Sequence, residues 1–266
     1  MSTVRPYLSL LSARFRLLLQ YRAAALAGIG TQVFWGWIRL MIFEAFYRSS
    51  TTPAPMDWSQ MVDYIWLGQA LFMLLPLGAD RDVQTLIRNG TVAYEMLRPV
   101  DLYGLWYTRA VAGRLAPTLL RAVPQFVLAG LFFGLDPPVS WASGAAWLLT
   151  TLGALLLTAA ITTFVTISLL WTISGEGVTR LVPSLAYLFS GVVIPLPFFP
   201  DWAQPILNAL PFRGLMDVPF RVYVGHIPPE QIGAVLAHQA AWIAALILLG
   251  RWLLARGTRR LVVQGG

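Results

Sequence analysis

The stretch DRDVQTLIRNGTVAYEMLRPVDLY, Asp80 to Tyr103, decides how the rest of the chain is interpreted. It is the longest charged interruption in the first half of an otherwise apolar chain, and it lies between two segments long enough to cross a bilayer. Apolar residues at helical spacing lead up to Asn89 and Gly90, which supply a helix stop. A second short apolar patch ends where Arg98 and Pro99 break the chain. The pattern predicts two short amphipathic pieces on a membrane surface, to which a partner docks.

The composition of the whole chain indicates a membrane protein. Of its 266 residues, 57% are hydrophobic and 12% are charged, and the mean hydropathy is +0.65. Soluble domains carry about 25% charged residues, roughly twice this share. We therefore predict an all-α polytopic membrane protein in which residues 1–266 form a single transmembrane domain. No cleavable signal peptide is expected, because the N-terminal arginines do not precede a short apolar core that ends in small residues.

Two amino acids are missing, and their absence excludes several kinds of chemistry. All 19 basic residues, counting lysine and arginine, are arginine. The chain therefore has no lysine with which a P-loop could hold nucleotide phosphates, and no lysine that could form a Schiff base. The lack of cysteine excludes thiol nucleophiles, disulfides and cysteine-ligated metals. The net charge of +7 comes from arginines that flank apolar spans, which indicates contact with lipid headgroups rather than with nucleic acid.

Six segments are long and apolar enough to be predicted as transmembrane helices. They cover approximately residues 23–46, 58–79, 102–135, 141–173, 178–199 and 232–254. Pro76 is expected to kink the second span, and prolines and glycines should leave the fifth broken or short. Outside the spans, the sequence predicts an amphipathic interfacial helix over residues 1–22, the charged segment 80–103 between spans two and three, and an outer hairpin of re-entrant or surface helices over residues 200–230.

Charge around the spans predicts the topology. Most arginines fall near one set of span ends, and only Arg48, Arg213 and Arg221 fall near the other. By the positive-inside rule both termini are predicted to be cytoplasmic, and so is the segment 80–103. Asp217 and Arg221 stand four residues apart and are expected to form an ordinary surface ion pair.

Charged residues within or beside the spans are candidates for function. Arg121 lies about 21 Å before the end of the third span by helical rise, so it should face the bundle or a wet cavity. Its alternative role is a structural pair with a carboxylate or with helix-end carbonyls. Glu176, between two glycines, is a candidate for gating, or else a cap or water-facing turn residue. Arg39 is expected to snorkel to the outer end of the first span.

Two stretches resemble a known family. IRNGTVAYEMLRPVDLYG, from Ile87 to Gly104, is similar to the cytoplasmic segment between the second and third spans of ABC-2-type permeases, closest to the branch called ABC-2 family transporter proteins. SGEGVTRLVPSLAYLFSGVVIPLPFFPDWAQPILNALPF, from Ser174 to Phe212, is similar to the fifth helix and outer hairpin of the same family. With the six-span order, the resemblance extends over nearly the whole chain.

The resemblance implies a membrane subunit of an ATP-driven exporter in the bacterial cytoplasmic membrane. Such permeases pair as homodimers or with a related chain, and they recruit two separate ATPase subunits that carry ATP and magnesium; no cofactor is expected on this chain. The substrate path would lie between paired subunits, lined by the first, second and fifth helices. The apolar, aromatic spans suit an amphiphilic substrate such as a drug, lipid or peptide.

The resemblance also assigns residues. The helix between the second and third spans would be a coupling helix that sits in a groove of the ATPase. Glu176 matches the polar turn of the family between the fourth and fifth spans. The residues that match the coupling segment are Arg88, Asn89, Gly90, Tyr94, Glu95, Leu97, Arg98 and Pro99.

Alternatives to an exporter subunit stay open at this point. The segment 80–103 can instead be a solvated loop whose apolar residues only touch lipid. The chain can be an ATP-independent channel or an immunity-type anchor. An intramembrane enzyme needs a nucleophile with a base, or paired carboxylates, and neither occurs at a defensible spacing. His226 and His238 are twelve residues apart and fit no metalloprotease motif, so no metal site is expected.

Overall fold

The computed structural model describes residues 5–20, 22–172 and 176–259, and every regular element in these ranges is a helix. The all-α class is thus confirmed. The α-helices are α1 (Arg5–Leu19), α2 (Arg22–Ser49), α3 (Trp58–Ala70), α4 (Arg81–Arg88), α5 (Val92–Met96), α6 (Leu102–Phe132), α7 (Trp141–Ser168), α8 (Glu176–Phe189), α9 (Gln204–Ala209), α10 (Asp217–Tyr223) and α11 (Ile232–Thr258). Between them lie the 3-10 helices η1 (Phe72–Leu74), η2 (Leu196–Phe198), η3 (Asp201–Ala203), η4 (Pro211–Gly214) and η5 (Pro229–Gln231).

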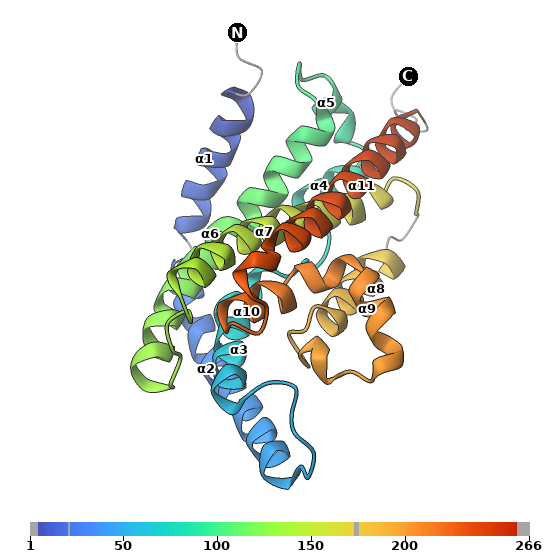
Figure 1. Cartoon of the computed structure of the whole chain (residues 1–266). Coiled ribbons are helices and arrows are strands. Elements are labelled where there is room, and N and C mark those ends of the chain that lie inside the picture. The colour runs from blue at the N-terminus through green and yellow to red at the C-terminus, as the bar shows by residue number, and fades with distance from the viewer. Residues whose placement is uncertain (1–4, 21, 173–175, 260–266) are drawn as a thin grey trace.

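Helix α7 lies at the centre of the bundle and packs against α6, α10 and α11 (Figure 1). Its second half is buried, because small and hydroxyl side chains let neighbouring helices approach closely. Two of the buried hydroxyls donate to carbonyls of their own helix. Thr163 Oγ1 donates to the Ala159 carbonyl at 2.8 Å, and Thr166 Oγ1 donates to the Thr162 carbonyl at 2.8 Å. The sequence composition of this span therefore predicted its central place correctly.

Three helices are long and apolar enough to cross a membrane, judged over the described residues by length and composition. They are α6, α7 and the stretch Pro229–Thr258, which joins η5 to α11. Helix α2, with 28 residues, is about 42 Å long and also has sufficient length. Helices α3 and α8, with 13 and 14 residues, do not reach that length, so the six-span order stays a prediction.

The predicted second span is wrong in its extent. Helix α3 ends at Ala70, and the chain then forms η1 and irregular backbone up to Asp80. Leu75 is extended, with φ −60° and ψ 143°, because the following Pro76 disfavours the helical conformation at the residue before it. Irregular backbone at this depth is tolerated only inside protein, and Leu74 and Leu75 are indeed buried.

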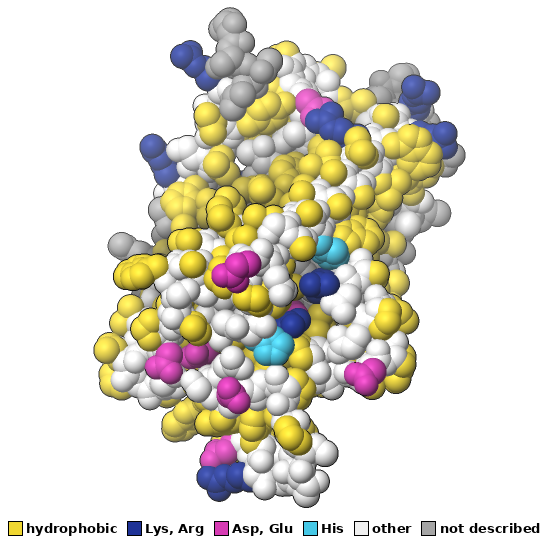
Figure 2. Space-filling model, in the orientation of Figure 1, with side chains coloured by type: hydrophobic (Ala, Val, Ile, Leu, Met, Phe, Trp, Pro, Cys, Tyr) yellow, Lys and Arg dark blue, Asp and Glu magenta, His cyan; other side chains and the backbone are white. Residues whose placement is uncertain are grey.

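The first and last described helices extend to the same end of the bundle, and the cytoplasmic location of that end stays a prediction. The start of α1, the helix α5 and the end of α11 lie at one end of the bundle, and the loop after α2 lies at the other (Figure 1). On the face shown in Figure 2, hydrophobic side chains cover much of the middle, and several arginines gather toward the end that carries α5.

The outer segment between α8 and α11 is built around a buried carboxylate. Asp217 is 0% exposed and accepts hydrogen bonds from Tyr64 Oη at 3.0 Å, Leu196 N at 2.9 Å and Arg221 Nη1 at 3.2 Å. The ion pair predicted between Asp217 and Arg221 does form, but its predicted place at the surface is wrong, because the carboxylate is buried. The apolar residues on the remaining faces of α10 are also buried, so this short helix is enclosed on most sides, which a spacing of four residues does not reveal.

Gly191 is where α8 turns into this outer segment, and replacing it by alanine should destabilise the protein. Its φ is +87°, and a Cβ there would lie 2.3 Å from Tyr64 Oη and 2.8 Å from Asp217 Cβ. Strain and overpacking together should cost about 2–4 kcal/mol. Thermal unfolding in detergent should show a lower midpoint for Gly191→Ala. As a control, Gly233→Ala in α11 enters open space and should leave the midpoint unchanged or slightly higher; equal midpoints for the two variants would contradict this account of the turn.

Candidate functional site

Helix α4 is delimited by its own sequence. The Asp80 carboxylate accepts hydrogen bonds from the backbone N–H groups of Asp82 at 3.0 Å and Val83 at 3.2 Å, so it caps the helix start. Asn89 follows the last turn, and Gly90 has φ +70°, a conformation that costs a glycine little. The predicted helix stop at Asn89 and Gly90 is confirmed.

Helix α5 is fastened to α6 by a buried carboxylate. Glu95 is 5% exposed; one of its oxygens accepts from Arg109 Nη2 at 2.5 Å and the other from Trp106 Nε1 at 2.8 Å. Val92, about one turn earlier, is also buried and lies in the same apolar cluster as Trp106. This arrangement fixes the position of α5 on the first turns of the long helix α6.

The end of α5 carries apolar side chains that no described residue covers. Tyr94 is 72% exposed and Leu97 is 80% exposed, and Arg98 beside them is also exposed. Leu97 directly follows α5, has a helical backbone conformation and comes three residues after Tyr94, so these two side chains share one side of the last turn. Together with Arg98, which is the next residue, they are here named the α5 face. Exposed apolar groups rimmed by charge are typical of protein or membrane contact sites.

The eight residues predicted for coupling therefore divide into two groups. Glu95 is buried and holds α5 in position through its hydrogen bonds to Trp106 and Arg109 of α6. The others are at the surface of the segment, on or beside the α5 face; these are Arg88, Asn89, Gly90, Tyr94, Leu97, Arg98 and Pro99.

Helix α1 clamps the start of α4. Arg14 lies 2.7 Å from the Asp82 carboxylate and 3.5 Å from that of Asp80, so one guanidinium bridges two acidic side chains. Helix α1 also packs along α6. A helix over Arg5–Leu19 thus occupies most of the predicted segment 1–22, of which residues 1–4 and 21 lie outside the described residues; its position in the membrane interface stays a prediction. One of its polar contacts is with the charged segment itself.

A second junction ties the start of α6 to α11 and α1. Asp101 caps α6 by accepting from Gly104 N at 2.8 Å, and it also pairs with Arg251 of α11 at 2.8 Å. The Asp101 backbone N–H donates to Tyr7 Oη of α1 at 3.1 Å. Asp101 therefore links the segment 80–103 to α1, α6 and α11. Arg14, Arg109 and Arg251 were missed in the sequence because their partners are distant along the chain.

Arg121 faces the interior of the bundle. Its Nη1 lies 3.3 Å from the Met73 sulfur, and its guanidinium lies against Gly28 of α2, where a Cβ would be 2.9 Å from Arg121 Cζ. Its buried Nε has no partner, and among the described residues no carboxylate pairs with it. The absence of a side chain at Gly28 gives this arginine its room.

Replacing Gly28 by leucine should displace the Arg121 side chain from its place between α2 and α6. The new side chain would collide with the Arg121 guanidinium and force it out of a partly buried site, which should cost about 1–3 kcal/mol. The matched control is Gly30→Leu, two residues along the same helix, where a Cβ meets nothing within 4 Å. Thermal unfolding of both variants in detergent tests this. A Gly30→Leu midpoint as low as that of Gly28→Leu would show that helix composition, not the contact with Arg121, sets the cost.

Glu176 begins α8, and its side chain lies outside the described residues, as do residues 173–175. The structure places it at the junction between α7 and α8, where the sequence predicted a turn. Its predicted part in gating stays a prediction, as does that of Arg121.

The fold and this site define a class of protein: an integral helical membrane protein with a surface segment that is held rigidly from inside and leaves an apolar face uncovered. The chain belongs to the family described as ABC-2 family transporter protein, whose sequence model matches residues 33–265. The resemblance found in the two stretches is thereby confirmed. No curated protein and no solved structure matches the chain significantly. Membership indicates the membrane permease component of an ABC transporter.

Proposed function

We propose that this chain is the permease subunit of an ATP-binding cassette exporter, which moves an amphiphilic substrate across the bacterial cytoplasmic membrane. Separate ATPase subunits, two for each pair of permease chains, bind ATP and magnesium and dock on the segment 80–103. The observation that carries the proposal is the α5 face. Tyr94 and Leu97 are among the more exposed apolar side chains, and the buried Glu95 between them holds α5 against α6.

The anchoring gives the segment the property that force transmission needs. A helix attached only by apolar contacts can slide, whereas the Glu95 carboxylate makes two directed, charge-assisted hydrogen bonds to α6. When the ATPases close on each other, α5 is displaced together with the first turns of α6. Packed helices move as rigid bodies between discrete arrangements, so the displacement is carried along α6 into the membrane.

The contacts of Arg14 and Asp101 extend the same movement to α1 and α11. Both are charged contacts at the surface of the bundle, where they can break and re-form at small cost. We assign to them the role of keeping α1, α4 and α11 in register with α5 during the cycle. The topology follows from this assignment: α5, the start of α1 and the end of α11 are cytoplasmic.

ATP hydrolysis by purified preparations tests the proposal. The chain copurified with a P-loop subunit should hydrolyse ATP and move a fluorescent amphiphile into inside-out vesicles, and the chain alone should do neither. Hydrolysis by the isolated chain would favour an enzyme, and ion flux through the isolated chain without ATP would favour a channel. Either result would overturn the proposal.

A further inference from the structure

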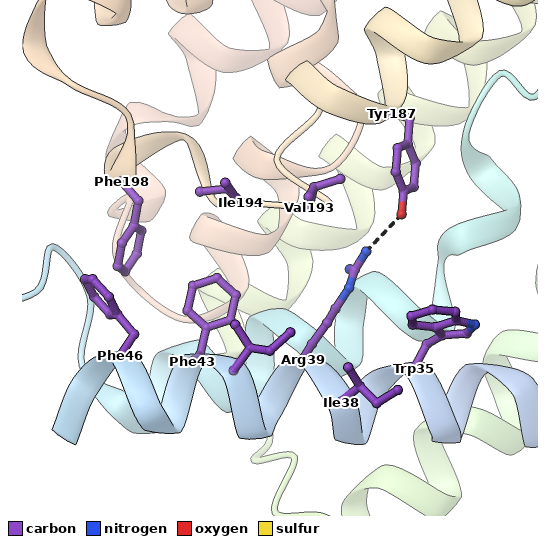
Figure 3. Close-up of a pocket in the computed structure, with 10 residues that line it drawn as sticks. Trp35, Ile38, Arg39, Phe43, Phe46, Tyr187, Val193, Ile194 and Phe198 are labelled. Atoms are coloured by element: carbon purple, nitrogen blue, oxygen red, sulfur yellow. Dashed lines mark hydrogen bonds between the residues drawn. The ribbon is translucent and has the colours of Figure 1, made fainter. Parts of the chain in front are cut away.

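A groove of about 530 Å³ lies between α2 and the chain from Tyr187 to Phe198, in the range of small-molecule sites (Figure 3). Its walls are almost entirely apolar. The rings of Phe43 and Phe46 on α2 and of Phe198 on η2 form one end, and Trp35 lies at the other. Trp35, Ile42 and Phe46 are all well exposed, so the groove is open to the surroundings of the bundle.

The groove contains one cationic side chain, Arg39. Its Nη2 donates to Tyr187 Oη at 3.3 Å, and its Nη1 donates to the Val192 carbonyl (Figure 3). The expectation that Arg39 snorkels to the outer end of its helix is wrong. It lies ten residues before the last residue of α2, Ser49, about 15 Å of helical rise, which is farther than the side chain reaches. It turns into the groove instead.

The charge of Arg39 is not neutralised within the described part of the groove. No aspartate or glutamate is among the lining residues, and no ion pair joins Arg39 to a described carboxylate. A guanidinium has five N–H donors, of which the two contacts use two. Tyr187 Oη accepts from Arg39, so its own proton remains available for donation. Together they offer several hydrogen-bond donors, and no carboxylate, to a ligand in the groove.

We infer that this groove binds an amphiphilic anion from the bilayer, with a phosphate or carboxylate group at Arg39 and Tyr187 and a hydrocarbon chain along Phe43, Phe46 and Phe198. The inference rests on the proposed function, because it assigns the chemical class of the transported substrate. An anion pairs with the guanidinium through charge-assisted hydrogen bonds, and the aromatic rings bury the chain.

Charge favours this occupant over a helix of a second copy of the chain. An apolar helix laid into the groove would bury the guanidinium with donors unmet and no counter-ion, which is costly away from water. A neutral lipid would satisfy the apolar walls but leave the same charge unpaired. An anionic amphiphile matches both parts of the groove at once.

Quenching of a tryptophan placed at Phe46, among the rings that would hold the hydrocarbon chain, tests the inference, because bromine quenches a tryptophan that it touches. The Phe46→Trp chain is placed in bilayers that contain phosphatidic acid, diacylglycerol or phosphatidylcholine with brominated chains, and the signal of the unchanged chain is subtracted to remove the native tryptophans. Phosphatidic acid should reach half-maximal quenching at a membrane fraction about tenfold lower than either other lipid, as expected for a charge-assisted contact. Diacylglycerol has no charged group, and the phosphate of phosphatidylcholine is balanced by its own choline. Inorganic phosphate in the buffer should not compete.

Variants separate the anion contact from the apolar contact. Arg39→Gln should abolish the preference for phosphatidic acid, and Arg39→Lys should retain most of it. Arg48→Gln is the matched control: it removes an exposed arginine from the outer end of the same helix and should change nothing. Equal quenching by all three lipids, which identifies ordinary boundary lipid, would overturn the inference. So would absence of quenching, which identifies a groove covered by another chain.

The anion site and the exporter can nevertheless fail separately in these experiments. Preference for phosphatidic acid in a chain that has no ATPase partner would keep the anion site and overturn the exporter. ATP-driven transport by a chain without the preference would keep the exporter and overturn the anion site.

Discussion

Replacing Leu97 by aspartate is expected to abolish ATP-driven transport while leaving the chain folded. The side chain is 80% exposed, so the substitution removes little buried area from the isolated permease. Its free energy of unfolding should therefore change by no more than a surface substitution changes it, about 0.5 kcal/mol. In the complex, a carboxylate would be buried in an apolar contact without a partner, which costs several kcal/mol. The affinity for the ATPase should therefore fall by about two orders of magnitude or more.

The measurement is the amount of ATPase that stays with the purified permease, together with the rate of ATP hydrolysis. Trp141→Asp is the matched control, because Trp141 is 97% exposed at the opposite end of the bundle and should not touch the ATPase. Full retention of the ATPase by Leu97→Asp would show that the α5 face contacts lipid or solvent instead.

Glu95→Ala should have the second large effect, on stability and on coupling together. Arg109 is 11% exposed at its side chain, and its Nε and Nη1 have no partner, so Glu95 is its one polar contact among the described residues. Removing one member of a buried pair leaves an uncompensated charge and costs about 3–5 kcal/mol. The exposed pair of Glu44 and Arg48 provides the control, since Glu44→Ala should cost under about 1 kcal/mol.

A double variant separates the two consequences of Glu95→Ala. Adding Arg109→Met removes the stranded charge, so Glu95→Ala/Arg109→Met should regain most of the lost stability. It does not restore the directed link between α5 and α6, so ATP hydrolysis by the complex should stay poorly coupled to transport. If transport recovers together with the thermal midpoint, Glu95 stabilises the fold and transmits nothing.

Local signals in the sequence were sufficient for the segment at the centre of this account. Asp80, Gly90 and Asp101 each act on the backbone within a few residues, so the start and end of α4 and the start of α6 could be predicted from the sequence. The same holds for the apolar composition of α7, which determines how it packs whatever its neighbours are.

Contacts between distant parts of the chain could not be predicted in this way. Glu95 looked like one more surface residue of an amphipathic helix, because its partners, Arg109 and Trp106, belong to the next helix. Asp217 looked like half of a surface pair, because the enclosing residue Tyr64 comes from α3. The room that Gly28 leaves for Arg121 likewise depends on how α2 crosses α6. Each of these depends on tertiary packing, which overrides local patterns.

The absence of cysteine allows the most direct test of the central claim, that an ATPase docks on the α5 face. Leu97→Cys places a single thiol on that face, and a short thiol-to-amine cross-linker added to membranes should join it to a P-loop ATPase subunit, identified by mass spectrometry. The cross-link should weaken when the Leu97→Cys chain also carries Tyr94→Asp, and Trp141→Cys should give none. A thiol at position 97 that reacts freely yet joins no ATPase, in membranes where ATP-driven transport is measured, would contradict the account.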